Sequence, residues 1–150
     1  MEEWIKVETD EDIRALLEGF SGFHDSCIVS ANYKSGNGVD EDGGMGFASR
    51  EDYQLDIVFQ SQMDDPIVLR FNGVRRMHLV GMQDNYFSDI FGASIKFYDN
   101  LFSKYGTERV VVWSDSTCFD IRNIDEPLKE PGITYIIANQ LKWKKMTDLT

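Results

Sequence analysis

The densest group of side chains that could do chemistry is His24-Asp25-Ser26, which directly follows Phe23. A histidine beside an acid and a hydroxyl supplies the residue types of a hydrolase centred on His24 and Asp25. The spacing is unfavourable, because neighbouring side chains on a strand point to opposite faces, and the sequence has no Gly-x-Ser-x-Gly segment. We expect these residues to satisfy backbone groups at a helix-to-strand corner, with a hydrolase-like enzyme as an alternative.

Metal and cofactor sites have weaker support in the sequence. The acids Asp40-Glu41-Asp42 lie in a glycine-rich segment, but a glycine follows too early and no acid occupies the closing position of a calcium loop. The two histidines and two cysteines are spread along the chain without the local pairs of a zinc site. We expect no metal and no cofactor, and we expect Cys27 and Cys118 to be small buried side chains on strands.

Acidic residues are concentrated towards the amino end. The first 56 residues contain fourteen acids and four bases, whereas the other 94 contain twelve and eleven; the net charge is −11. Such a charge repels nucleic acid and favours a basic protein as partner, although acidity that serves only solubility is an alternative. The expected partner-binding residues are Asp10, Glu11, Asp12, Glu18, Asp40, Glu41, Asp42, Glu51 and Asp52.

Basic residues form only two small groups, Arg75-Arg76 and a carboxy-terminal set of Lys142, Lys144 and Lys145. They are too few for a nucleic-acid surface, so we expect solvated strand faces. Lys142 and Lys144 could also flank Trp143 on an edge strand and prevent further pairing.

The hydrophobic pattern predicts one helix over residues 9–20. Thr9 can cap it, Asp12 completes a capping box, and acids occupy the positive end of the helix dipole. One apolar face follows from the spacing of Ile13, Leu16, Leu17 and Phe20.

From residue 26 onward the period changes to two, which is typical of strands. The sequence predicts an α+β fold with one N-terminal helix and about eight mostly antiparallel strands in a curved sheet or open barrel. Residues 35–50 hold five of the twelve glycines and are expected to form a mobile hairpin connection, and 83–92 could contain a helical turn. The predicted strands lie near 27–34, 53–60, 67–72, 77–79, 95–97, 110–113, 119–122 and 135–143.

The length of 150 residues and an apolar fraction of 42% are sufficient for one domain spanning residues 1–150. No apolar run approaches the roughly 20 residues of a membrane helix, and the start has no signal-peptide pattern, so we expect a cytoplasmic protein without membrane contact. Exposed strand edges leave a homo-oligomer open.

The segment Ile13–Leu17 and the junction Gly22-Phe23-His24-Asp25-Ser26 resemble a group of small bacterial proteins of unassigned function, with later similarity at 71–74 and 113–115. The group is similar in size, acidity and β content to immunity proteins of bacterial toxin systems. This resemblance implies a non-catalytic acidic protein that docks a basic partner. A curved sheet or barrel that binds a small apolar molecule is the alternative that the aromatic residues suggest.

Overall fold

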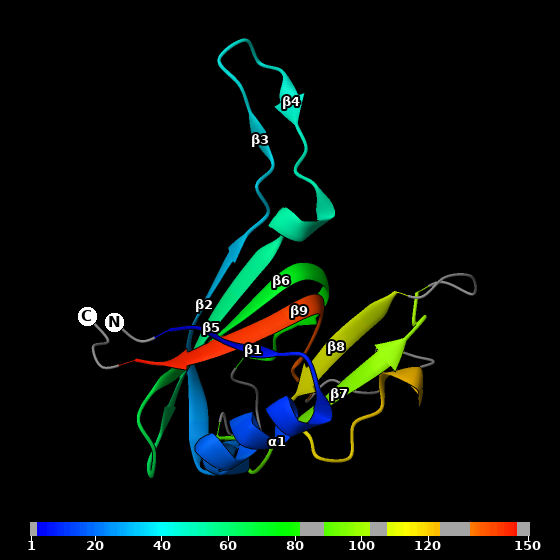
Figure 1. The fold of residues 1–150 in the computed structure, drawn as a ribbon. Coiled ribbons are helices and arrows are strands. Elements are labelled where there is room, and N and C mark those ends of the chain that lie inside the picture. The colour runs from blue at the N-terminus through cyan, green and yellow to red at the C-terminus, as the bar shows by residue number, and fades with distance from the viewer. Residues whose placement is uncertain (1–2, 82–88, 103–107, 124–132, 147–150) are drawn as a thin grey trace.

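The computed structural model describes residues 3–81, 89–102, 108–123 and 133–146 (Figure 1). Within them the chain forms one α-helix, nine strands and three short 3₁₀ turns, which confirms the predicted α+β fold. The elements are β1 (Ile5–Val7), α1 (Asp10–Gly19), η1 (Ser21–Phe23), β2 (Ser26–Lys34), β3 (Gly38–Val39), β4 (Met45–Gly46), η2 (Arg50–Asp52), β5 (Gln54–Ser61), β6 (Ile67–His78), β7 (Ser94–Asp99), β8 (Arg109–Ser114), η3 (Ile121–Asn123) and β9 (Tyr135–Lys145).

Seven strands form one antiparallel sheet that is curved and open, in the order β2-β5-β6-β9-β8-β7. The long strand β9 lies inside this sheet. One of its edges pairs with β6 over its whole length, and the other is shared between β8 and β1. The strands β3 and β4 form a separate hairpin, which projects away from the sheet (Figure 1).

The helix begins as the sequence predicts. The Thr9 hydroxyl accepts a hydrogen bond from the Asp12 amide at 3.1 Å, and the Asp12 carboxylate accepts from the amides of Glu8 and Thr9 at 2.9 and 3.0 Å. These bonds, the one from Glu8 foremost, lower the pKa of Asp12. The capping box therefore fixes the point at which the chain leaves β1 and enters α1.

The main hydrophobic core lies between α1, η1 and the inner face of the sheet. Phe23 is central to it, with ring centroids 5.0 Å from Phe20 and Phe59 and 5.6 Å from Trp113, all in edge-to-face geometry. These four rings are fully buried. Because the interior is closely packed, the aromatic residues that suggested a ligand cavity instead form the core.

A second, smaller cluster covers the opposite face of β7, β8 and the first half of β9. Phe119 stacks on Tyr135 with ring centroids 5.1 Å apart, and Ile121 packs beside them. The strand predicted over 119–122 is therefore wrong, because this segment lies on the sheet as loop and 3₁₀ turn rather than within it.

Three other sequence predictions need correction or lie outside the described residues. Cys118 is exposed in a turn and Cys27 is partly exposed on β2, so neither is the buried strand residue expected. Trp143 lies on an interior strand, not on an edge, so edge protection does not explain the lysines beside it. Most of the possible helical turn at 83–92 falls on residues 82–88, which are not described.

The helices in the described ranges are all too short or too polar to cross a membrane.

Candidate functional site

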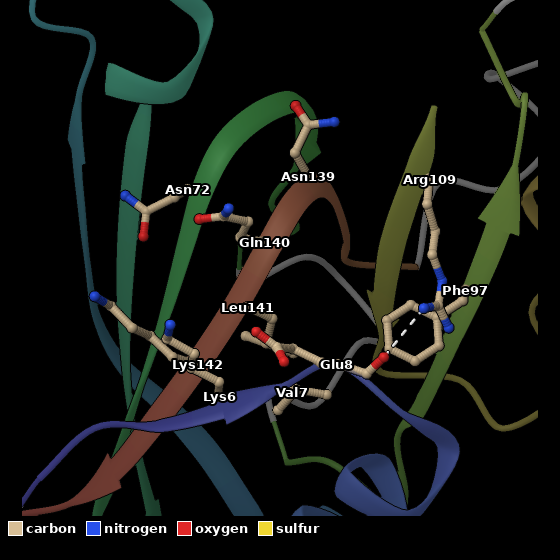
Figure 2. A pocket seen from close by; sticks show the side chains of 10 residues that line it. All are labelled: Lys6, Val7, Glu8, Asn72, Phe97, Arg109, Asn139, Gln140, Leu141 and Lys142. Carbon is tan, nitrogen blue, oxygen red and sulfur yellow. Dashed lines mark hydrogen bonds between the residues drawn. The ribbon is translucent and has the colours of Figure 1, made fainter. Parts of the chain in front are cut away.

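The most enclosed hollow on the sheet lies where β9 changes partners. Its pairing with β8 ends at Ala138 and its pairing with β1 begins at Leu141, so Asn139 and Gln140 lie between the two neighbouring strands. A pocket of about 260 Å³ opens at this gap and is shown in Figure 2. We call it the β9 pocket; its lining is Lys6, Val7, Glu8, Asn72, Phe97, Arg109, Asn139, Gln140, Leu141 and Lys142.

A backbone irregularity in β6 accompanies this gap. Gly73 has a φ of +69°, and the amides of Gly73 and Val74 both donate to the Tyr53 carbonyl, at 2.8 and 3.1 Å. A Cβ at Gly73 would lie 2.7 Å from Asn139 Oδ1. Glycine is therefore required here for its backbone conformation and for the close approach of β9.

Cationic side chains lie directly opposite one another beside the β9 pocket. Lys142 of β9 is the register partner of Lys6 in β1 and of Arg70 in β6. Of these three, only Arg70 forms an ion pair within the described residues: its guanidinium donates to both carboxylate oxygens of Asp56 at 2.8 Å, which raises the pKa of Arg70. Lys6 and Lys142 thus bring positive charge to one end of the pocket without a carboxylate partner.

Arg109 lies at the other end of the pocket (Figure 2). Its guanidinium carbon is 3.6 Å from the centroid of the Phe97 ring, and its Nη1 donates to the Glu8 carbonyl oxygen at 3.1 Å. Stacking and hydrogen bonding hold the guanidinium in one orientation. The Glu8 side chain extends into the space between Arg109 and the lysines, and it is the one acid of the lining.

A second hollow of about 350 Å³ adjoins the first and shares Asn72, Asn139 and Gln140 with it. Glu108 lies in its wall, where one carboxylate oxygen accepts from Arg50 at 3.3 Å, from Asn139 at 3.0 Å and from Arg75. Burial, and then the neighbouring Arg50, lower the pKa of Arg75. Two guanidinium groups thus share one carboxylate.

An aromatic side chain extends the basic surface beyond the pocket. The Trp4 ring lies 4.5 Å from the guanidinium carbon of Arg70, and 5.4 and 4.6 Å from the amines of Lys142 and Lys144. The face of the sheet turned away from α1 therefore carries a patch of positive charge, although the whole chain is strongly acidic.

The β3–β4 hairpin is a second candidate surface. Val39 and Met45 are directly opposite each other, and they and Phe47 are 64%, 63% and 79% exposed. The turn is closed by Asp40, whose carboxylate accepts from the amides of Asp42 and Gly44 at 3.0 and 2.7 Å. The carboxylates of the other two acids at the tip form no bond with any described residue.

The base of the hairpin is tied together by Asn37. Its amide oxygen accepts from the Ala48 backbone at 2.7 Å across the two sides, and its nitrogen donates to the Tyr53 hydroxyl at 3.1 Å. The predicted mobile connection thus contains an ordered hairpin with a fixed base, while its mobility stays a prediction.

The predicted partner-binding acids do not form one continuous surface. Asp10, Glu11, Asp12 and Glu18 belong to α1, at the opposite end of the molecule from the hairpin tip with Asp40, Glu41 and Asp42, and Glu51 and Asp52 lie in η2 between them (Figure 1). Asp12, Asp40 and Asp52 also accept hydrogen bonds from their own turns. The role of these acids in binding stays a prediction, and the tip is their most projecting group.

The His24-Asp25-Ser26 group lies at the corner between η1 and β2. His24 Nδ1 is 2.8 Å from the Phe91 carbonyl oxygen, and Nε2 is 3.3 Å from the Asp25 carboxylate. The Ser26 hydroxyl is buried and donates to the Phe23 carbonyl at 2.6 Å. Within the described ranges no bond joins Ser26 to His24, and His78 instead contacts the Ile133 carbonyl, so no nucleophile–base pair is assembled.

The backbone of this corner is unusual. Ser21, Gly22, Phe23 and Asp25 all have positive φ, between +51° and +67°. The Ala93 amide donates to the Gly22 carbonyl at 3.0 Å, and the Asp25 amide donates to the Ile90 carbonyl at 2.9 Å. The left-handed turn places Phe23 in the core, and these bonds to residues 90–93 hold it there.

Sequence reasoning did not find the β9 pocket. Its charged residues come from positions as distant as Lys6 and Lys142, which only the register of β1 and β9 brings together. One local signal was present: Ala138 and Leu141 are both inward-facing but three residues apart, so the alternation breaks at Asn139-Gln140.

Among the described residues, no three histidine, cysteine or acidic side chains come together as a metal site would require. Comparisons of the chain with protein-family models, with curated proteins and with solved structures return no match. A functional assignment must therefore start from the two surfaces described above.

Proposed function

We propose that this chain is a non-catalytic binding protein of the immunity type, which docks a basic partner protein through the β3–β4 hairpin. The observation that carries the proposal is the exposure of Val39, Met45 and Phe47 on an element that projects from the sheet. Large apolar side chains gathered on a projecting element are typical of protein-binding surfaces. In a partner complex they would be removed from water.

The charge of the hairpin supports a basic partner. Glu41 and Asp42 carry free carboxylates at the tip, and Asp40 adds a third negative charge while it closes the turn. Acidic groups at the most projecting point speed the encounter with a positively charged surface and repel acidic competitors. The apolar side chains behind the tip would then provide the lasting contact.

The fixed base of the hairpin favours binding as well. The bonds of Asn37 to Ala48 and Tyr53 reduce the number of orientations that the arm can adopt before it meets a partner. A preordered arm loses less conformational entropy on binding than a free loop would.

The experiment begins with the tagged chain expressed in its native host, from which co-purifying proteins are isolated and identified. A purified basic partner is then titrated calorimetrically with the wild type, with a Val39→Ser/Phe47→Ser variant and with Leu79→Ser. Leu79 is a matched control, because it is also an exposed apolar residue but lies away from the hairpin. We expect the hairpin variant to bind at least tenfold more weakly and the control to bind unchanged, a difference of about 1.4 kcal/mol or more.

The electrostatic part of the proposal is tested separately. Glu41→Gln/Asp42→Asn should slow association and reduce its dependence on salt, whereas Glu18→Gln on the helix should not. An acidic partner, or binding to a basic partner that neither hairpin variant changes, would contradict the proposal.

A further inference from the structure

We propose that the β9 pocket binds a small multivalent anion that carries carboxylate or phosphate groups. This site is distinct from the hairpin and takes a ligand of the opposite charge. It is built from three elements, since Lys6 comes from β1, Lys142 from β9 and Arg109 from β8.

The first argument is the row of cations across three strands. Lys6, Lys142 and Arg70 are successive register partners, and like charges in directly opposite positions destabilise a sheet. Asp56 compensates Arg70 alone, through two hydrogen bonds. The amines of Lys6 and Lys142 are left beside a pocket, where one anionic group could contact both.

The second argument is the orientation of Arg109 at the far end of the same pocket. Its guanidinium is stacked on Phe97 and bonded to the Glu8 carbonyl, so little freedom remains to be lost on binding. Since a guanidinium still has further N–H donors, it can receive a second anionic group. The positions of the lysines and Arg109 in Figure 2 fit a molecule with acidic groups at both ends.

The third argument concerns the floor of the pocket. Gln140 and Asn72 contribute carboxamides between the charged ends, and these can donate to and accept from hydroxyl or carbonyl groups of a ligand. A volume of about 260 Å³ suits a small molecule rather than a protein segment. Glu8 is the opposing charge, so a ligand must displace its side chain or place a hydroxyl donor against it.

The test is a calorimetric titration of the full-length protein with citrate for the carboxylate class and with pyrophosphate for the phosphate class. The side-chain amide signals of Asn72, Asn139 and Gln140 are followed by NMR in parallel. We expect saturable binding of at least one probe with shifts of these signals, and at least tenfold weaker binding of singly charged acetate. The stronger of the two probes identifies the acidic group that the pocket prefers.

Three variants define the site. Lys6→Gln/Lys142→Gln should weaken binding at least tenfold and Arg109→Gln several-fold, whereas Glu8→Gln should strengthen binding by removing repulsion. Lys34→Gln is the matched control, because Lys34 is a strand lysine that does not line the pocket. Val39→Ser/Phe47→Ser should leave anion binding unchanged, so failure here and failure of the hairpin proposal are distinguishable.

Two results would overturn the inference. One is the absence of saturable binding for both probes up to about 10 mM, the range of very weak ligands. The other is an equal loss of affinity in Lys34→Gln and in the Lys6/Lys142 variant, which would indicate general attraction to surface lysines.

Discussion

The two faces of β5, β6 and β9 differ sharply although the same strands supply both. The inner face carries Phe59, Leu69 and Trp143, which pack into the main core under α1. The outer face at neighbouring positions carries Val58, Arg70 and Lys142, and here like charges stand opposite one another. The first face lowers the free energy of folding by burial, whereas the second retains an arrangement that folding alone does not favour.

The outer face is itself divided. Over β7, β8 and the first half of β9 it is covered by Phe119, Ile121 and their neighbours, and over β1 and the rest of β9 it is open and positively charged. The boundary is the gap at Asn139 and Gln140. A site at such a boundary can combine a rigid apolar support on one side with solvent-accessible cations on the other.

The largest effect should come from the inner face. Phe59→Ala removes a fully buried ring that contacts Phe20, Phe23 and Trp113, and should lower the free energy of unfolding by about 3–5 kcal/mol in urea denaturation. Val58→Ala, one position away on the outer face, should cost less than about 1.5 kcal/mol. Equal losses in the two variants would remove the distinction between the faces.

The irregularity that positions the pocket should give the next largest effect. Gly73→Ala requires a strained positive φ and places a methyl group against Asn139, so it should lower the free energy of unfolding by about 1–3 kcal/mol. Gly38→Ala is the control, because a Cβ there meets nothing within 4 Å. If both variants melt at the wild-type temperature, β9 does not depend on this glycine.

Removal of one opposed charge should have a smaller effect of the opposite sign. Lys142→Gln relieves the repulsion from Lys6 and Arg70 and should stabilise the protein by about 0.2–1 kcal/mol at low salt. The gain should decrease as salt rises, because salt screens exposed charges. Thermal melts at two ionic strengths measure it, and a loss of stability would mean that the lysine stem contributes more by packing.

The smallest effect concerns a single titration in the segment that covers the outer face. Arg122 donates to the Asp120 carboxylate, which lowers the pKa of Asp120 from 3.8 to about 2. Folding thus favours the ionised form, and this contribution is present above pH 3.8 and lost as the pH falls through about 2. Arg122→Gln should return the pKa towards 3.8 in an NMR titration, and an unchanged pKa would rule out the ion pair as the cause.

Local patterns were sufficient to predict most of the elements. The capping box at Thr9 and Asp12 gave the helix start, and the alternation in 53–60 gave β5, because both depend on residues close in sequence. The apolar run Val110–Trp113 was expected to be a buried strand and pairs on both sides. The alternation at 119–122 misled, since it results from packing on a second cluster that no local pattern reveals.

The candidate site was less predictable because it depends on register. Lys6 and Lys142 are harmless at their separate positions and become an opposed pair only when β1 adds to the edge of β9. Likewise, the acids were expected to act together from their nearness in sequence, and the fold distributes them over α1, η2 and the hairpin. Charge counts along a chain therefore describe its total field better than its local surfaces.

The arm formed by residues 35–52 has one more consequence. The ladder between β2 and β5 closes at Lys34 and Gln54, and no residue of the arm belongs to either hydrophobic cluster. A tight turn could replace the arm and leave the scaffold intact, as could an arm of another length or composition. Recognition would then be an exchangeable part, and such a protein could acquire a new binding specificity by altering one insertion while its architecture stays the same.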